Sequence, residues 1–559
     1  MREGPTGQEG RILFAFLLGI FLLLSHGYIE NPDAEVEYQT ARSLVLRGHA
    51  GLSKDGVDAS AAEVLLLSAP RPFDVMRGRD GRWYSWFGIG HALVLAPFYL
   101  AGRGMALLLP SVEKTYLENC RAEPGGRSPA VAAALGEEFW SRLLVSLHSP
   151  LFGALAGWML YRLLGRLGFG KHVRIPACLL ALLGTQFGPE TRESMADTTT
   201  AFFLFAAVEA LLVPSGGTRT LVRGGLAAGM AVLCRPFLVL SLIPIGIFLL
   251  LRERREKAAL RDFLVFGAVL LPFGLFQLWF DYARFGDPFE MGYSAGTSEG
   301  YWSFPPLLGF FLLGFSPGKG LFWFSPLLWA VPYLYWKHRK GRGPILVLFL
   351  GLLLVPWILA SFTAGWHSSQ AWGVRYLSAG AVLVVASALA MAFDRDLRGS
   401  PRLRRVLFGL AGIGLLVQAG GWLTPYHGYY DLAFRAAAVR WADVPEGDRI
   451  HYLASDPRTS PLHGHWTYAW FNATGEIPSG SGRKVYGALF GEDLDSPPVP
   501  NLPEDRSFRH FWALGLGRRL DSVFPAVLGL LLLVLTVRAG RDLRRSLADS
   551  STGSDPIRR

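Results

Sequence analysis

Long apolar segments separated by short polar ones recur along the whole chain. Each segment approaches the roughly 20 apolar residues that a helix needs to cross a bilayer. The pattern therefore predicts an all-α polytopic membrane protein with roughly 12 transmembrane helices. Two long segments are interrupted by proline, so each is expected to form two helices or a re-entrant pair. The segments lie near residues 11–29, 88–109, 140–161, 175–188, 196–213, 224–251, 262–280, 305–336, 344–362, 373–393, 406–423 and 519–538, of which 224–251 and 305–336 are the interrupted ones.

The charge of the polar loops predicts the orientation. Cytoplasmic loops carry an excess of lysine and arginine, and the most basic loops here are 161–174, 252–261, 337–342, 394–405 and the tail from Arg538. The outward-facing loops are then 30–87, 189–196, 281–303, 363–372 and 424–517. Arginine outnumbers lysine, as in GC-rich bacterial genomes. We expect a multi-pass protein of a bacterial cytoplasmic (inner) membrane, with its outward loops outside the cytoplasm.

One loop does not fit this alternation. Residues 110–138 are slightly acidic, as an external loop would be, although the apolar segment 88–109 should have brought the chain inside. Two explanations are open. Either 88–109 is broken near Gly102 and Arg103, or 110–138 is cytoplasmic and a later crossing is misassigned.

The composition excludes a soluble domain and a nucleic-acid partner. Of the 559 residues, 51% are hydrophobic and 18% are charged, whereas soluble domains contain about 25% charged residues. The net charge of +11 collects in the short cytoplasmic loops and forms no basic face with interleaved aromatic residues. The three cysteines have no metal or redox spacing. We therefore assign no cofactor, and a divalent metal stays open.

The first external loop begins with several acids, in "NPDAEVEYQTARSL". Pro32 favours a helix that starts there, and the spacing of apolar residues predicts a short amphipathic helix along the membrane surface. Asp33 and Glu37 are four residues apart and share a face, with Glu35 between them. These acids either complement the helix dipole or provide a carboxylate that acts as a general base at the membrane boundary.

A second external segment, "GPETRESMAD", brings Arg192, Glu193 and Asp197 to a membrane edge. Glu193 and Asp197 share a helix face by the same four-residue spacing. The segment is either a solvated connection whose charges pair with one another or part of a site.

A third external segment, "WHSSQAWGVRY", contains Trp366, Trp372, Arg375 and Tyr376. Tryptophan is common at membrane interfaces, but an arginine at an outward-facing helix end runs against the positive-inside rule. Its planar fork suits phosphate, so we expect a lipid phosphate as its ligand. By contrast, "GFSPGKG" (314–320) is one residue too short for a nucleotide-binding loop and no Ser or Thr follows.

The ordered series of these segments resembles the GT-C class of integral-membrane glycosyltransferases, in the bacterial branch related to protein O-mannosyltransferases and lipid A aminoarabinose transferases. The series comprises "NPDAEVEYQTARSL", "WYSWFGIGHALVLAPFYL", "GTQFGPETRES", "GGLAAGMAVLCRPFLVLSLIP", "FGDPFEMGYS", "SPGKGLFWFSPLL" and "WGVRYLSAGAVLVV". The resemblance implies a GT-C-like bundle with an external first loop that bears short amphipathic helices. The resemblance covers about residues 11–395, and 424–517 lies outside it. From the apolar and polar segments we expect three regions, namely a transmembrane catalytic region at 1–423 (first external loop about 30–87), an extracytoplasmic polar segment at 424–517, and a last helix with a basic cytoplasmic tail at 518–559.

The resemblance also implies an activity, namely transfer of a sugar from a polyisoprenyl-phosphate donor to a lipid, glycan or protein acceptor outside the cytoplasm. It makes Asp33 the match for the first-loop acid that acts as base or positions the acceptor, and Arg375, Arg235 and Lys319 the ligands of the donor phosphate. Glu37 is the second predicted catalytic acid, because it shares a helix face with Asp33. The expected substrate contacts are Glu35, Arg192, Glu193, Asp197, Trp366, Trp372 and Tyr376. The chain departs from relatives that place two acids side by side, because Ala34 follows Asp33.

Two other functions stay open. A transporter or flippase of lipid-linked saccharides would also need many helices, but it should show internal repeats and ionisable residues within its spans. An assembly protein that has lost catalysis is the third possibility, since the paired acids are incomplete.

Overall fold

The structure, a computed structural model, describes residues 7–29, 32–52, 74–122, 138–213, 217–252, 256–293, 301–368, 371–396, 399–424, 426–445, 448–474 and 524–552. Within these ranges the chain is almost entirely helical, with one two-stranded sheet. Six helices there are long and apolar enough to cross a membrane by length and composition. The all-α polytopic fold class is confirmed. The six are α4 (Ile89–Leu108), α7–α8 (Phe139–Ser146 and His148–Arg166), α14 (Glu256–Phe285), α18 (Gly343–Ser361), η5–α19 (Arg375–Leu377 and Ser378–Arg395) and α20 (Pro401–Leu423).

These helices differ in how far the protein itself covers them. In α19, 83% of the apolar window is buried inside the molecule, whereas in α14 only 11% is buried. Since lipid is as apolar as a leucine side chain, a helix that faces the bilayer keeps its leucines exposed to it. The helix α19 therefore forms the centre of the bundle, and α14 lies at its lipid-facing periphery.

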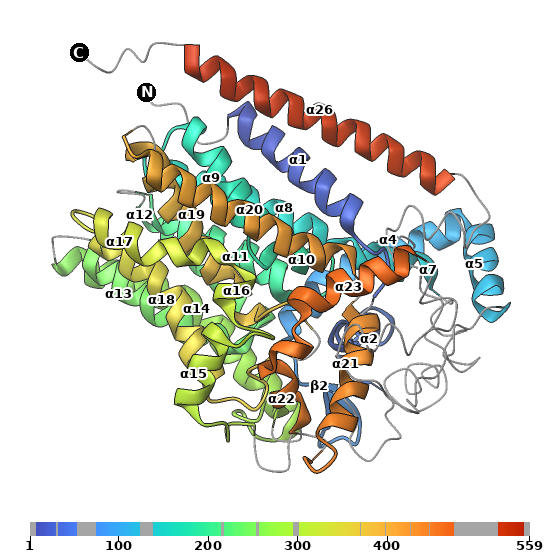
Figure 1. Ribbon diagram of the computed structural model, residues 1–559. Coiled ribbons are helices and arrows are strands. Elements are labelled where there is room, and N and C mark those ends of the chain that lie inside the picture. The colour runs from blue at the N-terminus through green and yellow to red at the C-terminus, as the bar shows by residue number, and fades with distance from the viewer. Residues whose placement is uncertain are drawn as a thin grey trace.

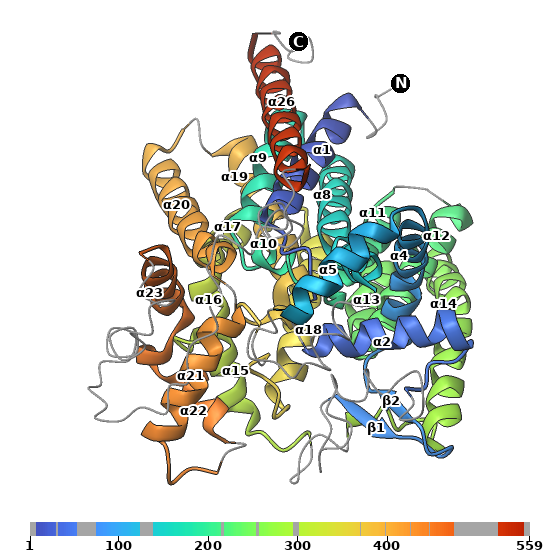
Figure 2. The same ribbon diagram turned by 90° about the vertical axis from the view of Figure 1, so that its right-hand side faces the viewer.

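The two ends of the chain pack together. Helix α1 (Gln8–Leu24) lies against α26 (Phe524–Thr552) and α8, and Gly19 faces Thr536 so closely that a side chain there would collide with its hydroxyl. Small residues allow such close helix contacts in membranes. Figures 1 and 2 show both termini at the same end of the bundle.

The two proline-interrupted segments are broken as predicted. In the first, α12 (Gly217–Cys234) ends before Pro236, and the chain continues as η2 (Pro236–Ser241) and α13 (Leu242–Arg252). The second divides into α15 (Pro306–Phe315), α16 (Leu321–Phe324), η4 (Pro326–Ala330) and α17 (Val331–His338). Because proline lacks an N–H donor and clashes with the preceding turn, each break falls beside one. The remaining helices of the bundle are α9 (Lys171–Leu183), α10 (Phe187–Glu190) and α11 (Ala196–Leu211).

At the end away from the termini lie α2 (Pro32–Arg47) and a hairpin of β1 (Val75–Arg77) and β2 (Trp83–Ser85) (Figures 1 and 2). The strands are antiparallel, with Val75 opposite Ser85 and Met76 opposite Tyr84. The described part of the polar segment 424–517 lies at the same end, as α21 (Tyr426–Arg440), α22 (Arg449–Ser455), η6 (Pro457–Thr459) and α23 (Pro461–Ala473). Residues 475–517 of that segment lie outside the described residues.

Two sequence-based expectations need correction. Helix α4 runs unbroken through Gly102 and Arg103, so a break there does not explain the loop 110–138. It packs along α2 and α7, and α5 (Pro110–Ala122) follows it. Helix α2 is not a surface helix with one buried face, because residues 33–41 are buried on every side. Its polar side chains find partners on other helices, which allows them to be buried.

Candidate functional site

The site begins at the first turn of α2. Pro32 occupies the first helical position, where its missing N–H costs nothing, and Asp33 follows it. The Asp33 carboxylate accepts a hydrogen bond from Nη2 of Arg375, which opens η5 and is 342 residues away in the chain. Both residues are 7% exposed. The second Nη atom of Arg375 contacts the sulfur of Met195. The fold thus joins the first external loop to the start of the central helix α19.

This pairing decides the charge of Asp33. Burial alone would raise the pKa of Asp33, but the guanidinium of Arg375, a hydrogen bond with Asp74 and the charge of Arg235 together hold that pKa below its ordinary value. A nearby opposite charge favours the ionised form of a carboxyl group. Asp33 is therefore a carboxylate at neutral pH.

Asp74 is a member of the site that the sequence analysis missed. It directly precedes β1, it is 5% exposed, and its carboxyl group is hydrogen-bonded to that of Asp33. Burial and the neighbouring charge of Asp33 raise the pKa of Asp74 well above its usual range. No motif in the sequence marks it, since Asp74 stands alone before the short strand Val75–Arg77. The fold thus brings together two acids that lie 41 positions apart in the chain.

A second ion pair lies beside the first. Asp197, at the start of α11, accepts a hydrogen bond from Arg235 at 2.6 Å. The guanidinium carbon of Arg235 lies 5.6 Å from the centre of the Tyr376 ring, and that of Arg375 lies 5.7 Å from it. Both distances are within the range of a cation–π contact. The ring therefore holds the two arginines close together in spite of their like charges.

The turn that carries Arg375 is fixed by Gln186. Its amide nitrogen donates to the carbonyl of Val374 at 2.6 Å and contacts the hydroxyl of Ser378 at 2.7 Å, and its oxygen accepts from the Val374 N–H. Gly373 has φ of +65° and lies against the Gln186 oxygen, so a side chain there would be both strained and crowded. Gln186 is a positioning residue that the sequence analysis also missed.

Glu190 extends the acidic side of the cluster. It accepts a hydrogen bond from Ser378. Burial, followed by the nearby charges of Asp197 and Glu193, raises the pKa of Glu190 well above its ordinary value. Glu193, a predicted substrate contact, thus lies beside Glu190 and near Asp197. Three acids gathered this way disfavour one another's charge.

Glu37, the second predicted catalytic acid, faces another direction. Its carboxylate lies 2.9 Å from Nδ1 of His91, and Nε2 of His91 lies 3.0 Å from Nε2 of His148. Nδ1 of His148 is 2.6 Å from the carbonyl of Val145, which can only accept a hydrogen bond. Glu37 is thus part of a buried chain with two histidines that connects α2 to α4 and α8. Its catalytic role stays a prediction.

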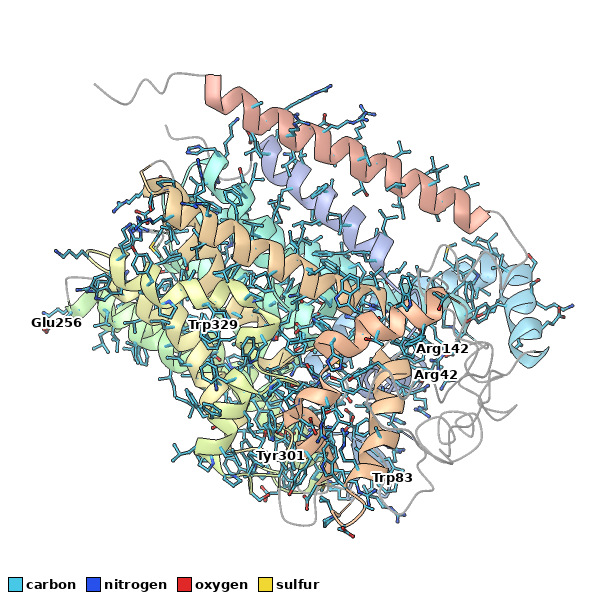
Figure 3. All side chains as sticks on the ribbon, viewed as in Figure 1. Arg42, Trp83, Arg142, Glu256, Tyr301 and Trp329 are labelled. Atoms are coloured by element: carbon cyan, nitrogen blue, oxygen red, sulfur yellow. The ribbon has the colours of Figure 1, made fainter. Side chains whose placement is uncertain are left out.

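Glu35 forms a separate buried pair. Arg142 donates two hydrogen bonds to it, at 2.7 and 2.9 Å, and Gln39 donates a third at 2.8 Å. The guanidinium of Arg142 also lies 4.5 Å from the centre of the Tyr38 ring. Figure 3 shows Arg142 beside Arg42, which pairs with Glu138. Every oxygen of Glu35 is occupied by protein, which indicates a structural role.

Lys319 lies in the loop between α15 and α16 and is fully buried. Its Nζ donates to the carbonyl of Ala371 at 2.5 Å and lies 4.7 Å from the centre of the Tyr430 ring of α21. Burial lowers the pKa of Lys319 well below its usual value, Glu193 opposes this effect, and Arg375 adds to it. Lys319 is therefore within electrostatic range of the arginine pair, under a cover that α21 contributes.

Three other predicted contacts hold helices together. Nη1 of Arg192 donates to the carbonyls of Gly421 and Trp422 at 2.6 Å each, at the carboxyl end of α20, where a cation also favours the helix dipole. The indole of Trp366 donates to His451 at 3.0 Å, and the indole of Trp372 donates to Gln418 at 2.9 Å. Their contact with substrate stays a prediction.

An aromatic cluster adjoins Arg235. Phe237, two residues further along, lies 4.8 Å from the ring of Tyr293, and Tyr293 lies 4.9 Å from that of Tyr301 and stacks on Trp86. Figure 3 shows Tyr301 at the lower end of the molecule, where α2 and the hairpin lie. Phe237 also touches Trp302, whose side chain is 49% exposed. The rings thus lead from the arginine pair to the surface.

The described residues contain no group of three or more His, Cys, Asp or Glu side chains arranged to hold a metal ion. Whether a divalent metal takes part in the reaction is therefore tested by the transfer assay with chelator described below.

Residues 130–280 match the family model of the dolichyl-phosphate-mannose-protein mannosyltransferases. The expected resemblance to such glycosyltransferases is therefore supported over residues 130–280. The matched segment contains Arg192, Glu193, Asp197 and Arg235, whereas Asp33 and Arg375 lie outside it, so the match assigns neither of these two a role.

The other comparisons add little. The crystal structure of ArnT from Cupriavidus metallidurans bound to undecaprenyl phosphate aligns over 92% of this chain and 77% of that one, with 14% sequence identity and a TM-score of 0.42. This likeness is too weak to assign a role to any residue. No curated protein matches the chain.

Proposed function

We propose that this protein is a glycosyltransferase that moves a sugar from a polyisoprenyl-phosphate donor to an acceptor on the outer side of the membrane. One observation carries the proposal, namely the buried carboxyl group of Asp33 that is hydrogen-bonded to Arg375 next to a second arginine, Arg235. A base and two phosphate-binding groups are what this transfer needs. The family model that matches residues 130–280 takes its description from a dolichyl-phosphate sugar donor, which supports the same donor class.

In the proposed reaction Asp33 is the general base. The acceptor oxygen attacks the anomeric carbon while its proton passes to the Asp33 carboxylate. The bond between the anomeric carbon and the phosphate oxygen breaks, and its electron pair stays on the lipid phosphate. Arg375 and Arg235 stabilise the charge that grows on that phosphate, because a fork of N–H donors matches its oxygens. Lys319 is the third cation assigned to the donor.

The donor's lipid chain fits the aromatic cluster beside Arg235. Phe237 and Trp302 adjoin exposed apolar side chains of η2 and α13, among them Val239 (48% exposed) and Ile243 (53% exposed). An isoprenyl chain can lie in the bilayer along this apolar surface, because lipid is as apolar as these side chains, with its phosphate at the arginines. Glu193, Asp197 and Tyr376 surround the same position and are the proposed contacts of the transferred hexose or pentose.

The site is assigned to the outer side of a bacterial cytoplasmic membrane. Helix α2 lies at the end of the bundle away from the two termini (Figure 1), and the tail after Arg538 is among the most basic segments. Basic segments stay in the cytoplasm, so the acids of α2 face outward. Nucleotide sugars are made inside the cell, and a lipid-linked donor is what an outward site can use.

The test is a transfer assay in proteoliposomes with radiolabelled polyprenyl-phosphate hexoses and pentoses. It compares the wild type with Asp33→Asn and Arg375→Gln, and with Asp80→Asn as a matched control, since Asp80 is exposed on the nearby hairpin. We expect Asp33→Asn to lower transfer by about 10²–10⁴-fold and Asp80→Asn to leave it unchanged. A parallel reaction with chelator decides whether a divalent metal takes part.

Two outcomes contradict parts of the proposal. Transfer that survives in Asp33→Asn would move the base to Glu37 or Glu193. If the wild type transfers no sugar from any donor, the proposed glycosyltransferase activity is wrong. The protein would then be a transporter of lipid-linked saccharides or an inactive relative. Uptake of a fluorescent lipid-linked sugar by the same vesicles separates these last two.

A further inference from the structure

Asp33 and Asp74 form a contact that two ionised acids cannot make. Their carboxyl groups are hydrogen-bonded to each other, and the side chains are 7% and 5% exposed. An ionised carboxylate only accepts hydrogen bonds. One proton must therefore lie between the two groups, and one of the two is a neutral acid.

The surroundings decide which group holds the proton. Asp33 accepts a hydrogen bond from Arg375, so its negative charge is compensated. Among the described residues no N–H or O–H group donates to the buried Oδ2 of Asp74. A buried charge without such partners is costly, whereas a neutral carboxyl group without them costs much less. The charged and titratable groups that act on Asp74 from neighbouring elements are Asp33 and Glu37 of α2, Arg375 of η5 and Tyr293.

We propose that Asp74 is protonated at neutral pH and donates its hydrogen bond to the Asp33 carboxylate, which makes Asp74 a positioning residue for the base. The proposal rests on the function proposed for Asp33. In the reaction the acceptor's proton goes to Asp33, so the carboxyl pair changes from one shared proton to two. No charge builds up on Asp74 at any step.

A neutral Asp74 also keeps the site able to receive an anion. Asp33 and Asp197 carry two negative charges, and Arg375 and Arg235 balance them. A third carboxylate at Asp74 would make the cluster acidic and repel the phosphate of the donor. The hydrogen bond from Asp74 thus orients Asp33 without adding charge.

The backbone of Asp74 makes this idea testable. Its φ is +56°, in the left-handed region, which asparagine and aspartate tolerate better than other residues with a side chain. Asparagine has the same shape as a protonated aspartate and also donates a hydrogen bond from its side chain. Asp74→Asn therefore mimics the proposed state, whereas Asp74→Ala removes the donor and strains the backbone.

The first measurement does not depend on activity. Infrared difference spectra of the wild type minus Asp74→Asn at neutral pH should show the C=O stretch of a protonated carboxyl group, shifted in D₂O. The same band should disappear in Asp33→Asn, because Asp74 then faces Arg375 without a competing charge and ionises. Any other protonated carboxyl group is present in both proteins, so its signal cancels in the difference, and Asp80→Asn gives no band.

The second measurement is transfer. Asp74→Asn should retain at least tenfold more transfer than Asp74→Ala, a difference of the order expected when a catalytic group is misplaced. Loss of transfer in Asp74→Asn as severe as in Asp33→Asn would show that Asp74 is itself the ionised base. An infrared difference without the band would also overturn the proposal. If the wild type transfers no sugar, the spectra still decide the proton, and only the proposed function fails.

Discussion

Helix α2 carries two buried carboxylate–arginine pairs two residues apart, and they have different surroundings. Glu35 accepts two hydrogen bonds from Arg142 and one from Gln39, so one carboxylate is paired with one guanidinium. Asp33 meets Arg375, but a second acid, Asp74, lies on one side. A second arginine lies on the other. Like charges held together in the interior are costly and persist where a function uses them. These surroundings favour a structural role for the first pair and support the role proposed for the second.

The largest expected effect is on the rate of transfer, which should depend on the Asp33–Arg375 pair and much less on the Glu35–Arg142 pair. Asp33→Asn is expected to lower transfer by about 10²–10⁴-fold per folded molecule, because it removes the general base. Its thermal unfolding should change far less than that of Glu35→Gln. The measurement combines single-turnover transfer with the melting temperature in detergent. Equal losses of transfer in both variants would mean that the two pairs do not differ in role.

The free energy of unfolding should depend more on the Glu35–Arg142 pair than on the Asp33–Arg375 pair. Glu35→Ala leaves Arg142 buried without its partner, which costs about 3–5 kcal/mol. Chemical denaturation followed by the tryptophan signal measures this loss. The double variant Glu35→Ala with Arg142→Leu should recover part of it, since no unpaired charge remains. No recovery would show that the pair acts through something other than charge.

The pH dependence of transfer sharpens the comparison further. Arg375 holds the pKa of Asp33 below its ordinary value, so the wild type should keep its base ionised well into the acid range. In Arg375→Gln the effect of burial is less opposed and that pKa rises, so transfer is lost at a higher pH on acidification. Arg142→Gln should leave the acid limb where it is. The lowered pKa of Asp33 also stabilises the folded protein. This stabilisation is fully present above the pKa of Asp33 in the unfolded chain, and it is lost as the pH falls through the pKa in the folded protein.

The smallest expected effect concerns Lys319. Because burial lowers the pKa of Lys319 well below its usual value, a bound phosphate should draw a proton onto it. Calorimetric titration with a polyprenyl phosphate in buffers of different ionisation enthalpy should show proton uptake by the wild type. Lys319→Met should abolish the uptake and weaken binding by about tenfold or less, whereas Tyr430→Phe should change neither. Uptake that persists in Lys319→Met would point to another group.

The sequence by itself determined the fold class, because apolar segments of bilayer length admit little besides transmembrane helices. It also located the two helix breaks beside prolines, although α4, α14 and α18 run on through Pro97, Pro272 and Pro356. It singled out Asp33 and Arg375, because an acid after a first helix and an arginine at an outward helix end are costly unless used.

Only the tertiary structure decided which of the candidate residues meet. Sequence spacing put Glu37 on the face of Asp33, but His91 of another helix takes its carboxylate. Asp74 is 41 positions after Asp33 and carried no motif, yet the hairpin brings the two carboxyl groups into contact. Such pairings depend on how distant segments pack, and local periodicity carries no information about that. The sequence therefore predicted the region of the candidate site. The contact between Asp33 and Asp74 followed only from the tertiary packing.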